Sequence, residues 1–424
     1  MTKISKYVCV MFPYPSGAGL HLGHYYNYAL MDSYARWLRQ RGEEVFTPFG
    51  YDSFGLPAEL YARSISRDPK DVTEENITNF RVQMERMNTQ FEERLITSRP
   101  DYYRWSQWIF TKLLEHDLAY KAEGEVNWCD ACGTVLANEQ AQGGICERHG
   151  TSVEQRVMSQ WYFRITAYKD RLIAGLDGLN YPQGTIKQQR EWLENLRDWG
   201  VSRQRSWGTP IPLEDETDTL DTFVDSSFYY LRYLTDSRDE LIPSAEYKQV
   251  DVYVGGPEHA CMHLIYARFI HYFLYDIGIV PVEEPFKRVV HQGMITAAGA
   301  KMSKSKGNAV SPDDYDPDEL RFYLMFLGPY VDGGDWNDQH IKGVRKFFNR
   351  MKLWLNQPGE DEADLDALQG LIDGYVESFK FNKVVSSFME FYNRNKGKRL
   401  TPACQDRLVK MLRVFAPSFV VGNV

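Results

Sequence analysis

The sequence predicts an α/β protein: a doubly wound parallel sheet with a small inserted metal ribbon and a C-terminal helical bundle. Three observations support this. The chain opens with a strand–turn–helix–strand unit, it carries a compact Cys/His segment at 129–149, and it becomes wholly helical after Asp338. We expect the first half of the sheet domain over 1–120, the ribbon over 121–155, the second half over 156–335 and the bundle over 336–424.

The composition is that of an ordinary soluble protein, with 43% hydrophobic and 25% charged residues in 424. No N-terminal signal segment and no bilayer-spanning run stand out, so we expect a cytoplasmic protein without membrane contact. A net charge of −9 weighs mildly against a large RNA footprint, although it leaves a local basic face open.

The N-terminal stretch from Tyr7 to His24 combines a strand, a tight turn and a helix start. Tyr7–Phe12 is a short apolar run typical of a strand buried on both faces, and prolines and glycines end it. Apolar spacing then predicts a helix from about His21 to just before Gly42. A helix start after such a turn is an anion site, to which His21 and His24 can add donors. The alternative is two histidines that merely begin a helix.

Residues Glu43–Phe49 predict the second strand, parallel to the first through a right-handed crossover. Asp52 follows at the carboxyl end of that strand, where open α/β sheets bind ligands, and can receive an ammonium or a hydroxyl. Its alternative role is that of a turn aspartate. Asp71–Leu95 and Tyr103–His116 are predicted to be amphipathic helices that pack over the sheet.

The segment 129–149 predicts a structural zinc site. Cys129 and Cys132, like Cys146 and His149, are separated by two residues, a spacing that places three thiolates and one imidazole tetrahedrally around Zn²⁺. No ligand position is left open for a substrate. Such a cluster also indicates a reducing compartment.

Helical pattern is expected over Glu154–Tyr181. The stretch Arg190–Pro212 that follows carries Arg197, Arg203 and Arg205 among tryptophans, and it can bind phosphates or bases or serve as a packing surface.

The second half of the sheet domain supplies three further groups of polar residues. Phe223, Ser226 and Tyr229 recur every three residues and are expected on one helical face. A strand at Val250–Val254 is followed by glycines and one carboxylate that suit a ribose, at Gly255, Gly256 and Glu258. His259 and His263 are four apart on the next predicted helix; a zinc pair there is the weaker interpretation, since no third ligand is evident.

A last strand is expected at Phe286–Met294, followed by a lysine-rich loop. Lys301, Lys304 and Lys306 can close on a triphosphate and compensate departing pyrophosphate, or they can be a solvated surface. The bundle is predicted to have four helices, starting near 338, 361, 382 and 401.

Taken together, HLGH at 21–24 and KMSKS at 301–305 resemble the two signature motifs of class I aminoacyl-tRNA synthetases. The finer resemblance is to the leucyl-tRNA synthetase family, carried by MFPYPSGAGLHLGH, GYDSFGLPAE, VNWCDACGTVLANEQ, RDWGVSRQRSWGTPIP, DTFVDSSFYYLRY and GGPEHACMHLIYAR. It extends over about residues 5–355 and implies a Rossmann-like catalytic domain.

The resemblance implies a role for each candidate residue. His21, His24, Lys301 and Lys304 would be catalytic, acting on the ATP phosphates and, with Mg²⁺, on pyrophosphate. The implied ATP-binding residues are Gly23, Gly255, Gly256, Glu258, Gln292, Met294, Met302 and Ser303. The implied amino-acid-binding residues are Met11, Phe12, Tyr14, Asp52, Phe223, Ser226, Tyr229, His259 and His263.

The sequence departs from the family pattern in the regions that proofread and bind tRNA. Leu193 runs almost directly into Arg197, which leaves no room for the family's editing domain, and the C-terminal RNA-binding extension is expected to be missing. We therefore expect a monomeric enzyme that activates leucine, or a close aliphatic analogue, with ATP. The acceptor is expected to be a carrier-protein thiol or a small-molecule amine.

Two alternatives stay open. One is a genuine leucine–tRNA ligase with minimal tRNA contacts or a partner subunit; Arg203, Arg205 and the cluster Arg394, Lys396, Lys398 and Arg399 are its candidate basic face. The other is a non-catalytic, adenylate-binding regulatory paralogue.

Overall fold

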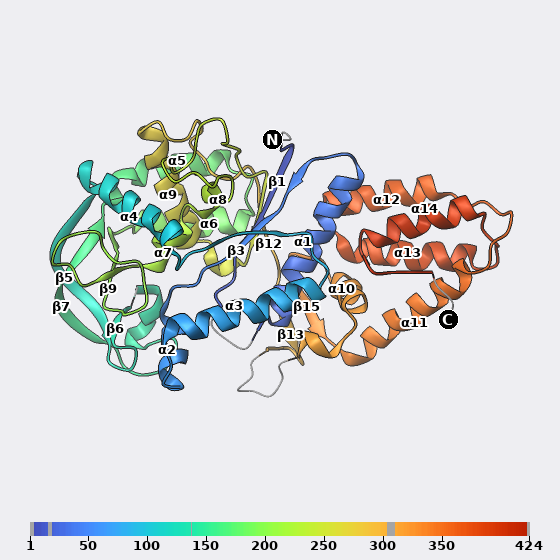
Figure 1. Ribbon diagram of the computed structural model, residues 1–424, viewed down its shortest axis with the longest axis horizontal. Coiled ribbons are helices and arrows are strands. Elements are labelled where there is room, and N and C mark those ends of the chain that lie inside the picture. Colours follow the sequence, from blue (N-terminus) through green and yellow to red (C-terminus); the bar gives the residue numbers. More distant parts are fainter. Residues whose placement is uncertain (1–3, 16–18, 137, 303–309, 422–424) are drawn as a thin grey trace.

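The computed structural model describes residues 4–15, 19–136, 138–302 and 310–421. Figure 1 shows a central parallel sheet, with an antiparallel sheet at one end of the molecule and a helical bundle at the other. No helix in the described part of the chain is long and apolar enough to cross a membrane.

The central sheet is parallel throughout, in the order β12-β11-β1-β2, and β3 continues β2 to pair with β4. The predicted second strand is thus interrupted at Thr47. The strands are β1 (Lys6–Val10), β2 (Val45–Phe46), β3 (Pro48–Tyr51), β4 (Glu92–Ile96), β11 (Val252–Gly255) and β12 (Val289–His291). This order places the first strand at the centre, with chain segments added on both sides, as in a doubly wound sheet.

Helices cover both faces of this sheet, which explains the continuous apolar run of β1. Val8 and Val10 belong to one hydrophobic core and Tyr7 and Cys9 to the other, and all four are fully buried. The surrounding helices are α1 (Leu22–Gln40), α2 (Leu56–Ser64), α3 (Pro69–Arg86), α4 (Pro100–Glu115), α9 (His263–Asp276) and α10 (Pro317–Phe326).

A buried ion pair joins α1 to α10. Arg321 lies 2.6 Å from Asp32, and each side chain is 1% exposed. Asp32 also accepts from Arg36, and Arg321 donates to the Met87 carbonyl. Because both charges have left water, each depends on the other for its stability.

The prediction of helix over Glu154–Tyr181 was wrong for its first half. Glu154–Phe163 is strand β7, which pairs along its length with β5 (Ala119–Cys129) in the antiparallel order β6-β5-β7-β8. Most of its side chains alternate between an exposed and a partly buried face. Pairing with the neighbouring strands, rather than the helix-like local pattern, therefore decides the structure of this segment. The other elements here are β6 (Thr134–Leu136), α5 (Lys169–Gly175), α6 (Gln183–Glu194) and β8 (Trp199–Gly200).

Other expectations were confirmed in part. The segment Asp71–Leu95 ends as a strand, because α3 stops at Arg86 and β4 begins at Glu92. The expected helix around Ser226 is broken into α7 (Thr222–Ser226) and α8 (Tyr229–Arg232). Two small sheets complete the second half: β9 (Ser202–Arg203) with β10 (Thr219–Leu220), and β13 (Ile295–Ala297) with β14 (Ala300–Lys301) and β15 (Gly334–Trp336).

The four predicted C-terminal helices are confirmed. They are α11 (Asp338–Leu355), α12 (Leu365–Glu377), α13 (Phe381–Asn395) and α14 (Pro402–Arg413), and Thr401 caps the last one as its sequence indicated. Their apolar faces join the same core as α1 and α10.

Candidate active site at the carboxyl edge of the parallel sheet

At the N-terminus of α1, the side chains of His21 and His24 each accept a hydrogen bond from the other residue's backbone N–H. His21 is the N-cap, and its Nδ1 accepts from the backbone N–H of Gly23 (3.1 Å) and of His24 (3.4 Å). His24 Nδ1 accepts in turn from the His21 N–H at 3.2 Å, and the rings stack 3.7 Å apart. With Nδ1 accepting, each neutral ring carries its proton on Nε2 and so offers an N–H donor.

Burial, and then the neighbouring His21, hold the pKa of His24 well below its ordinary value. His24 is therefore neutral at pH 7. Two ring N–H donors held at a helix N-terminus, where the helix dipole favours negative charge, suit a phosphate.

The carboxyl ends of β11 and β12 form a close-packed glycine corner. A Cβ at Gly255 would lie 1.9 Å from Met11 Sδ, and one at Gly256 would lie 2.2 Å from Glu258 Oε2. With its amide oriented to satisfy both groups, Gln292 donates to the Gly255 carbonyl (2.9 Å) and accepts from the Gly256 N–H (3.2 Å). The corner brings Met11 of the predicted amino-acid pocket next to Glu258 and Gln292 of the predicted ATP site.

His291 belongs to the same corner and was missed by the sequence interpretation. Its Nδ1 lies 2.8 Å from the Gly255 carbonyl, to which it donates, and its buried Nε2 has no partner among the described residues. Burial lowers its pKa, which favours the neutral ring with a free acceptor. Its place just before Gln292, at the end of a buried strand, was the available signal.

Asp52 lies buried at the end of β3. Its backbone N–H donates to Pro13, and Oδ1 accepts from the Thr97 hydroxyl at 3.3 Å. Oδ2 has no hydrogen-bond partner among the described residues, and the side chain is almost fully buried. Burial, and then the nearby Asp225, raise the pKa of Asp52 well above its ordinary value. A buried carboxylate with an unpaired oxygen calls for a cationic partner.

Asp225 is a second buried carboxylate that sequence analysis did not single out. Its Oδ1 accepts from Ser106 (2.5 Å) and Thr209 (2.8 Å), and its Oδ2 has no partner among the described residues. Burial raises its pKa to about 7. It sits between the sequence-predicted Phe223 and Ser226 on α7, so its proximity to them was the only hint.

A chain of hydrogen bonds links three of the predicted pocket residues through Tyr253. Ser226 Oγ lies 3.4 Å from His263 Nδ1, His263 Nε2 lies 2.5 Å from the Tyr253 hydroxyl, and that hydroxyl lies 2.7 Å from the hydroxyl of Tyr229. Phe12 stacks on the Tyr229 ring at 3.9 Å. Burial lowers the pKa of His263 to about 3, so the ring is neutral.

The predicted pocket residues His259, Tyr14 and Phe223 lie outside this chain of hydrogen bonds. His259 is not on the helix of His263, because a 3-10 turn (Pro257–His259) precedes α9, but the two rings meet edge to face at 5.9 Å. Burial, and then the nearby Asp52, raise the pKa of the Tyr14 phenol well above its ordinary value. Phe223 is partly buried and contacts Tyr266.

The lysine loop is described only at its edges. Lys301 ends β14, opposite Thr296 of β13, and Met302 packs partly buried against the core that contains α1. Met294 is 56% exposed. Ser303, Lys304 and Lys306 lie outside the described residues.

The four predicted metal ligands converge. The ligand atoms of Cys129, Cys132, Cys146 and His149 all lie within 4.8 Å of one another. Cys132 Sγ is 3.7 Å from Cys146 Sγ and 3.3 Å from His149 Nδ1. Tetrahedral zinc, with bonds of ~2.3 Å to sulfur and ~2.1 Å to nitrogen, requires separations of about 3.8 and 3.6 Å. The residues therefore fit Zn²⁺.

The ribbon rests on the segment that follows Asp52. Leu56 of α2 shares a small buried cluster with the three cysteines and Leu136. A zinc ion bound there would stabilise the entrance of α2 rather than take part in chemistry, because protein atoms fill all four ligand positions.

Of the predicted basic residues, Arg203 and Arg205 do not form an exposed face. Arg203 is 4% exposed and ion-paired with the buried Asp221. Burial lowers the pKa of Arg205 to about 10. The C-terminal candidates Arg394, Lys396, Lys398 and Arg399 are all exposed; among them Arg394 pairs with Glu390 at 3.6 Å, and Lys398 donates to the Glu362 carbonyl.

Comparison with known proteins places this geometry in one family. Residues 6–347 match the model of the class I tRNA synthetases (M). A leucine–tRNA ligase of Clostridium kluyveri is 30% identical over 694 aligned positions, covering 98% of this chain and 85% of the relative. One of Clostridium tetani is 28% identical, covering 97% of this chain and 85% of the relative.

Solved structures of synthetases have the same fold as this chain. The leucyl enzyme of Agrobacterium radiobacter K84, in a complex with tRNA and LeuAMS, superposes with a TM-score of 0.90 at 25% identity, covering 98% of this chain and 84% of that one. A methionyl-tRNA synthetase of Mycobacterium tuberculosis shares the fold, with a TM-score of 0.76 at 21% identity over 97% of this chain and 88% of its own. With a match of this extent, the chain belongs to the class I tRNA synthetases, as a relative of the leucine–tRNA ligases.

Proposed function

We propose that this protein activates leucine, or a close aliphatic analogue, with ATP to give an aminoacyl-adenylate and pyrophosphate. The His21 and His24 donors would bind the ATP phosphates, and Lys301 and Lys304, with Mg²⁺, would neutralise the departing pyrophosphate. Gly255 and Glu258 would hold the ribose, and Gln292 the adenine. Catalysis would rest on positioning and charge, without a covalent nucleophile.

The observation that carries this proposal is the buried carboxylate of Asp52. Its Oδ2 has no hydrogen-bond partner among the described residues, and burial, followed by the nearby Asp225, raises its pKa, so the ionised carboxylate would be stabilised by a cation. The α-ammonium of an amino acid would supply one, and the Phe12–Tyr229 stack would offer an apolar wall to an aliphatic side chain. The neutral His263 supports the same assignment, because it adds no charge to the pocket.

We also propose that the enzyme works without the family's editing step. α6 ends at Glu194 and β8 begins at Trp199, so only residues 195–198 connect them. The 694 positions aligned with the Clostridium kluyveri enzyme exceed the 424 residues of this chain, so at least 270 of them have no counterpart here. A hydrophobic pocket separates substrates that differ by one methylene by only about 1–3 kcal/mol. An unedited product would be harmful in translation, which favours an acceptor other than the translational tRNA pool.

ATP–pyrophosphate exchange tests the activation step. We expect leucine-dependent exchange in the absence of tRNA, and loss of exchange in Lys304→Ala with retained binding of a non-hydrolysable leucyl-adenylate analogue. No exchange with any aliphatic amino acid would refute the proposal and favour an adenylate-binding regulatory protein.

A second candidate is a genuine leucine–tRNA ligase. The TM-score of 0.90 to a leucyl enzyme solved with tRNA favours it. Direct charging of purified tRNA distinguishes the two: stable leucyl-tRNA at rates near those of exchange would establish the ligase and remove the need for another acceptor.

A further inference from the structure

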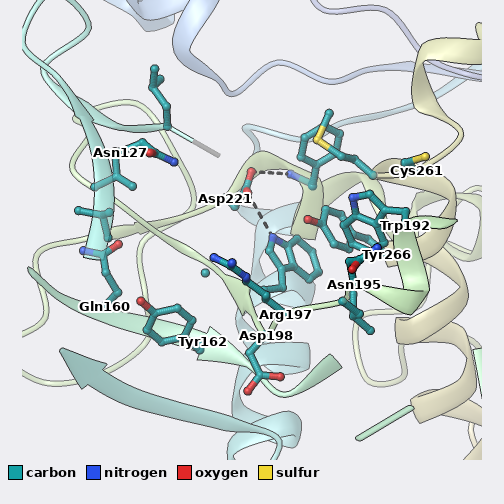
Figure 2. A pocket seen from close by; sticks show the side chains of 18 of the residues that line it. Asn127, Gln160, Tyr162, Trp192, Asn195, Arg197, Asp198, Asp221, Cys261 and Tyr266 are labelled. Atoms are coloured by element: carbon teal, nitrogen blue, oxygen red, sulfur yellow. Dashed lines mark hydrogen bonds between the residues drawn. The ribbon is translucent and has the colours of Figure 1, made fainter. Parts of the chain in front are cut away.

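A large cavity lies between the antiparallel sheet and α6, outside the predicted ATP and leucine residues except for Phe223. Its volume is about 820 Å³, within the range of small-molecule sites. Figure 2 shows Asn127, Gln160 and Tyr162 on one side, and Trp192 and Tyr266 on the other.

Aromatic rings form both walls. On the α6 side, Trp199 stacks on Tyr266 at 3.8 Å with an interplanar angle of 1°, and Trp192 meets Tyr266 edge-on at 6.0 Å. On the facing wall, Tyr120 and Tyr162 stack at 5.5 Å. Rings held in this way contact an apolar or aromatic body and attract a cation by their faces.

The charges of the lining favour a cation over a polyanion. Arg203 is neutralised by Asp221, and Asp198 accepts hydrogen bonds from Tyr120 (2.7 Å) and Thr166 (2.6 Å). Among the described residues, the other charged lining residues are Glu125, Glu191 and Arg197. Glu191 also lies 3.8 Å from Lys187, in an ion pair that is exposed on both sides and therefore weak. A tRNA end or a phosphate-bearing arm would need several cations here.

The inner end of the cavity shares elements with the proposed leucine site. Phe223 lines the cavity, and the carbonyl of Phe223 accepts from Ser226 Oγ at 3.4 Å. Cys261 and Met262 line it from between His259 and His263. Gln189 of α6 anchors the same segment by donating to the Ala260 carbonyl at 2.9 Å.

The outer end is formed by the short α6–β8 connection. Asn195, Leu196, Arg197 and Asp198 all line the cavity, and Figure 2 shows Arg197 directed into it. The segment that leaves no room for an inserted domain therefore also shapes a wall of this site.

We infer that this cavity is the acceptor site and that it takes a small primary amine with an aromatic or apolar body. The inference rests on the proposed leucine activation. The amine nitrogen would attack the carbonyl carbon of leucyl-adenylate, forming a C–N bond. The ammonium that the cavity binds would first release one proton to solvent, which frees the nitrogen lone pair for this attack. As the C–N bond forms, the bond from that carbon to the phosphate oxygen would break, AMP would leave with the electron pair, and the nitrogen would release a second proton to solvent. The product is a leucyl amide, and no further reactant is required.

The experiment uses the full chain with leucine, ATP and Mg²⁺, and with phenethylamine or tyramine as probes. We expect each amine to accelerate AMP release at least tenfold over the amine-free rate and to yield the leucyl amide by mass spectrometry. Hydroxylamine, which is too small to need the cavity, serves as the reference trap for the adenylate.

Two substitutions on α6 make the test specific. Glu191 lines the cavity and Glu194 does not, although both are exposed. Glu191→Lys should raise the KM for the amine about three- to tenfold, an effect that weakens in salt, whereas Glu194→Lys should change it less than about twofold. Asn195→Trp, at the rim, should suppress amide formation while leaving hydroxylamine trapping and exchange intact.

The outcomes separate the two proposals. Absence of both exchange and hydroxamate refutes leucine activation itself. Exchange and hydroxamate without amine-stimulated AMP release refute the acceptor assignment alone. A lower KM for coenzyme A in Glu191→Lys, with formation of leucyl-coenzyme A, would also overturn it, because the site would then prefer an anionic thiol arm. Leucyl-tRNA formation that Asn195→Trp abolishes would overturn it in favour of tRNA.

Discussion

Replacing Asp52 by Asn should separate the stability of the protein from its activity. The side chain is 1% exposed and Oδ2 has no partner among the described residues, so the carboxylate costs free energy in the empty site. Asn keeps the shape and can still accept from Thr97 through its oxygen. It removes the charge that the α-ammonium would meet.

The expected loss of activity follows from the burial. Leaving one member of a buried ion pair without its partner costs about 3–5 kcal/mol, which corresponds to roughly 10²-fold to 4 × 10³-fold. We expect Asp52→Asn to lower kcat/KM for leucine in ATP–pyrophosphate exchange by that factor, with the KM for ATP changed less than about twofold. The exposed Asp101→Asn is the matched control and should retain full exchange.

The stability of the empty protein should change in the opposite direction. A carboxyl whose pKa is raised on folding adds stability below its unfolded pKa of ~3.9, and this contribution is lost as pH rises through the folded value. At pH 7 Asn has no such penalty, so the Tm of Asp52→Asn without ligands should equal or exceed that of the parent protein by differential scanning fluorimetry. A loss of exchange below fivefold, or a Tm lowered by several degrees, would contradict the role of Asp52.

Three further predictions concern other parts of the molecule. Asp32→Ala should lower the free energy of unfolding, measured in urea, by about 3–5 kcal/mol, because it leaves the buried Arg321 charge uncompensated. The double variant Asp32→Ala/Arg321→Met should recover most of this loss. A double variant whose loss equals the sum of the two single losses would contradict the coupling. Cys146→Ser should reduce bound zinc from one equivalent to near zero by mass spectrometry of metals, and unchanged zinc would exclude the four-ligand site. Because burial raises the pKa of Asp225 to about 7, the Tm should fall as pH rises from 6 to 8 and the buried carboxyl ionises. Asp225→Asn should flatten this dependence of Tm on pH. An unchanged dependence would mean that other groups cause it.

The parts of the fold that the sequence predicted well have strong local signals. In β1, Val8 and Val10 face one core, and Tyr7 and Cys9 face the other. A strand buried on both faces must be apolar at every position, and such a run is visible in the sequence. The helical bundle was found from its apolar spacing and its caps. The convergence of Cys129, Cys132, Cys146 and His149 was predicted because their spacing is that of known zinc sites.

The errors arose where tertiary pairing decides the structure. Strand β7 was interpreted as helix because its partner, β5, lies some 30 residues earlier in the chain and leaves no local trace. Asp225 and His291 were missed for a related reason. Each is an ordinary polar residue in the sequence, and only the fold buries it and leaves an oxygen or a nitrogen unpaired.

The most direct test of the account is leucine-dependent ATP–pyrophosphate exchange by the purified protein without tRNA. We predict exchange with leucine that is at least tenfold faster than with any chemically dissimilar amino acid, and lost in Lys304→Ala. Exchange that appears only when tRNA is added, or none with any aliphatic amino acid, would contradict the central claim.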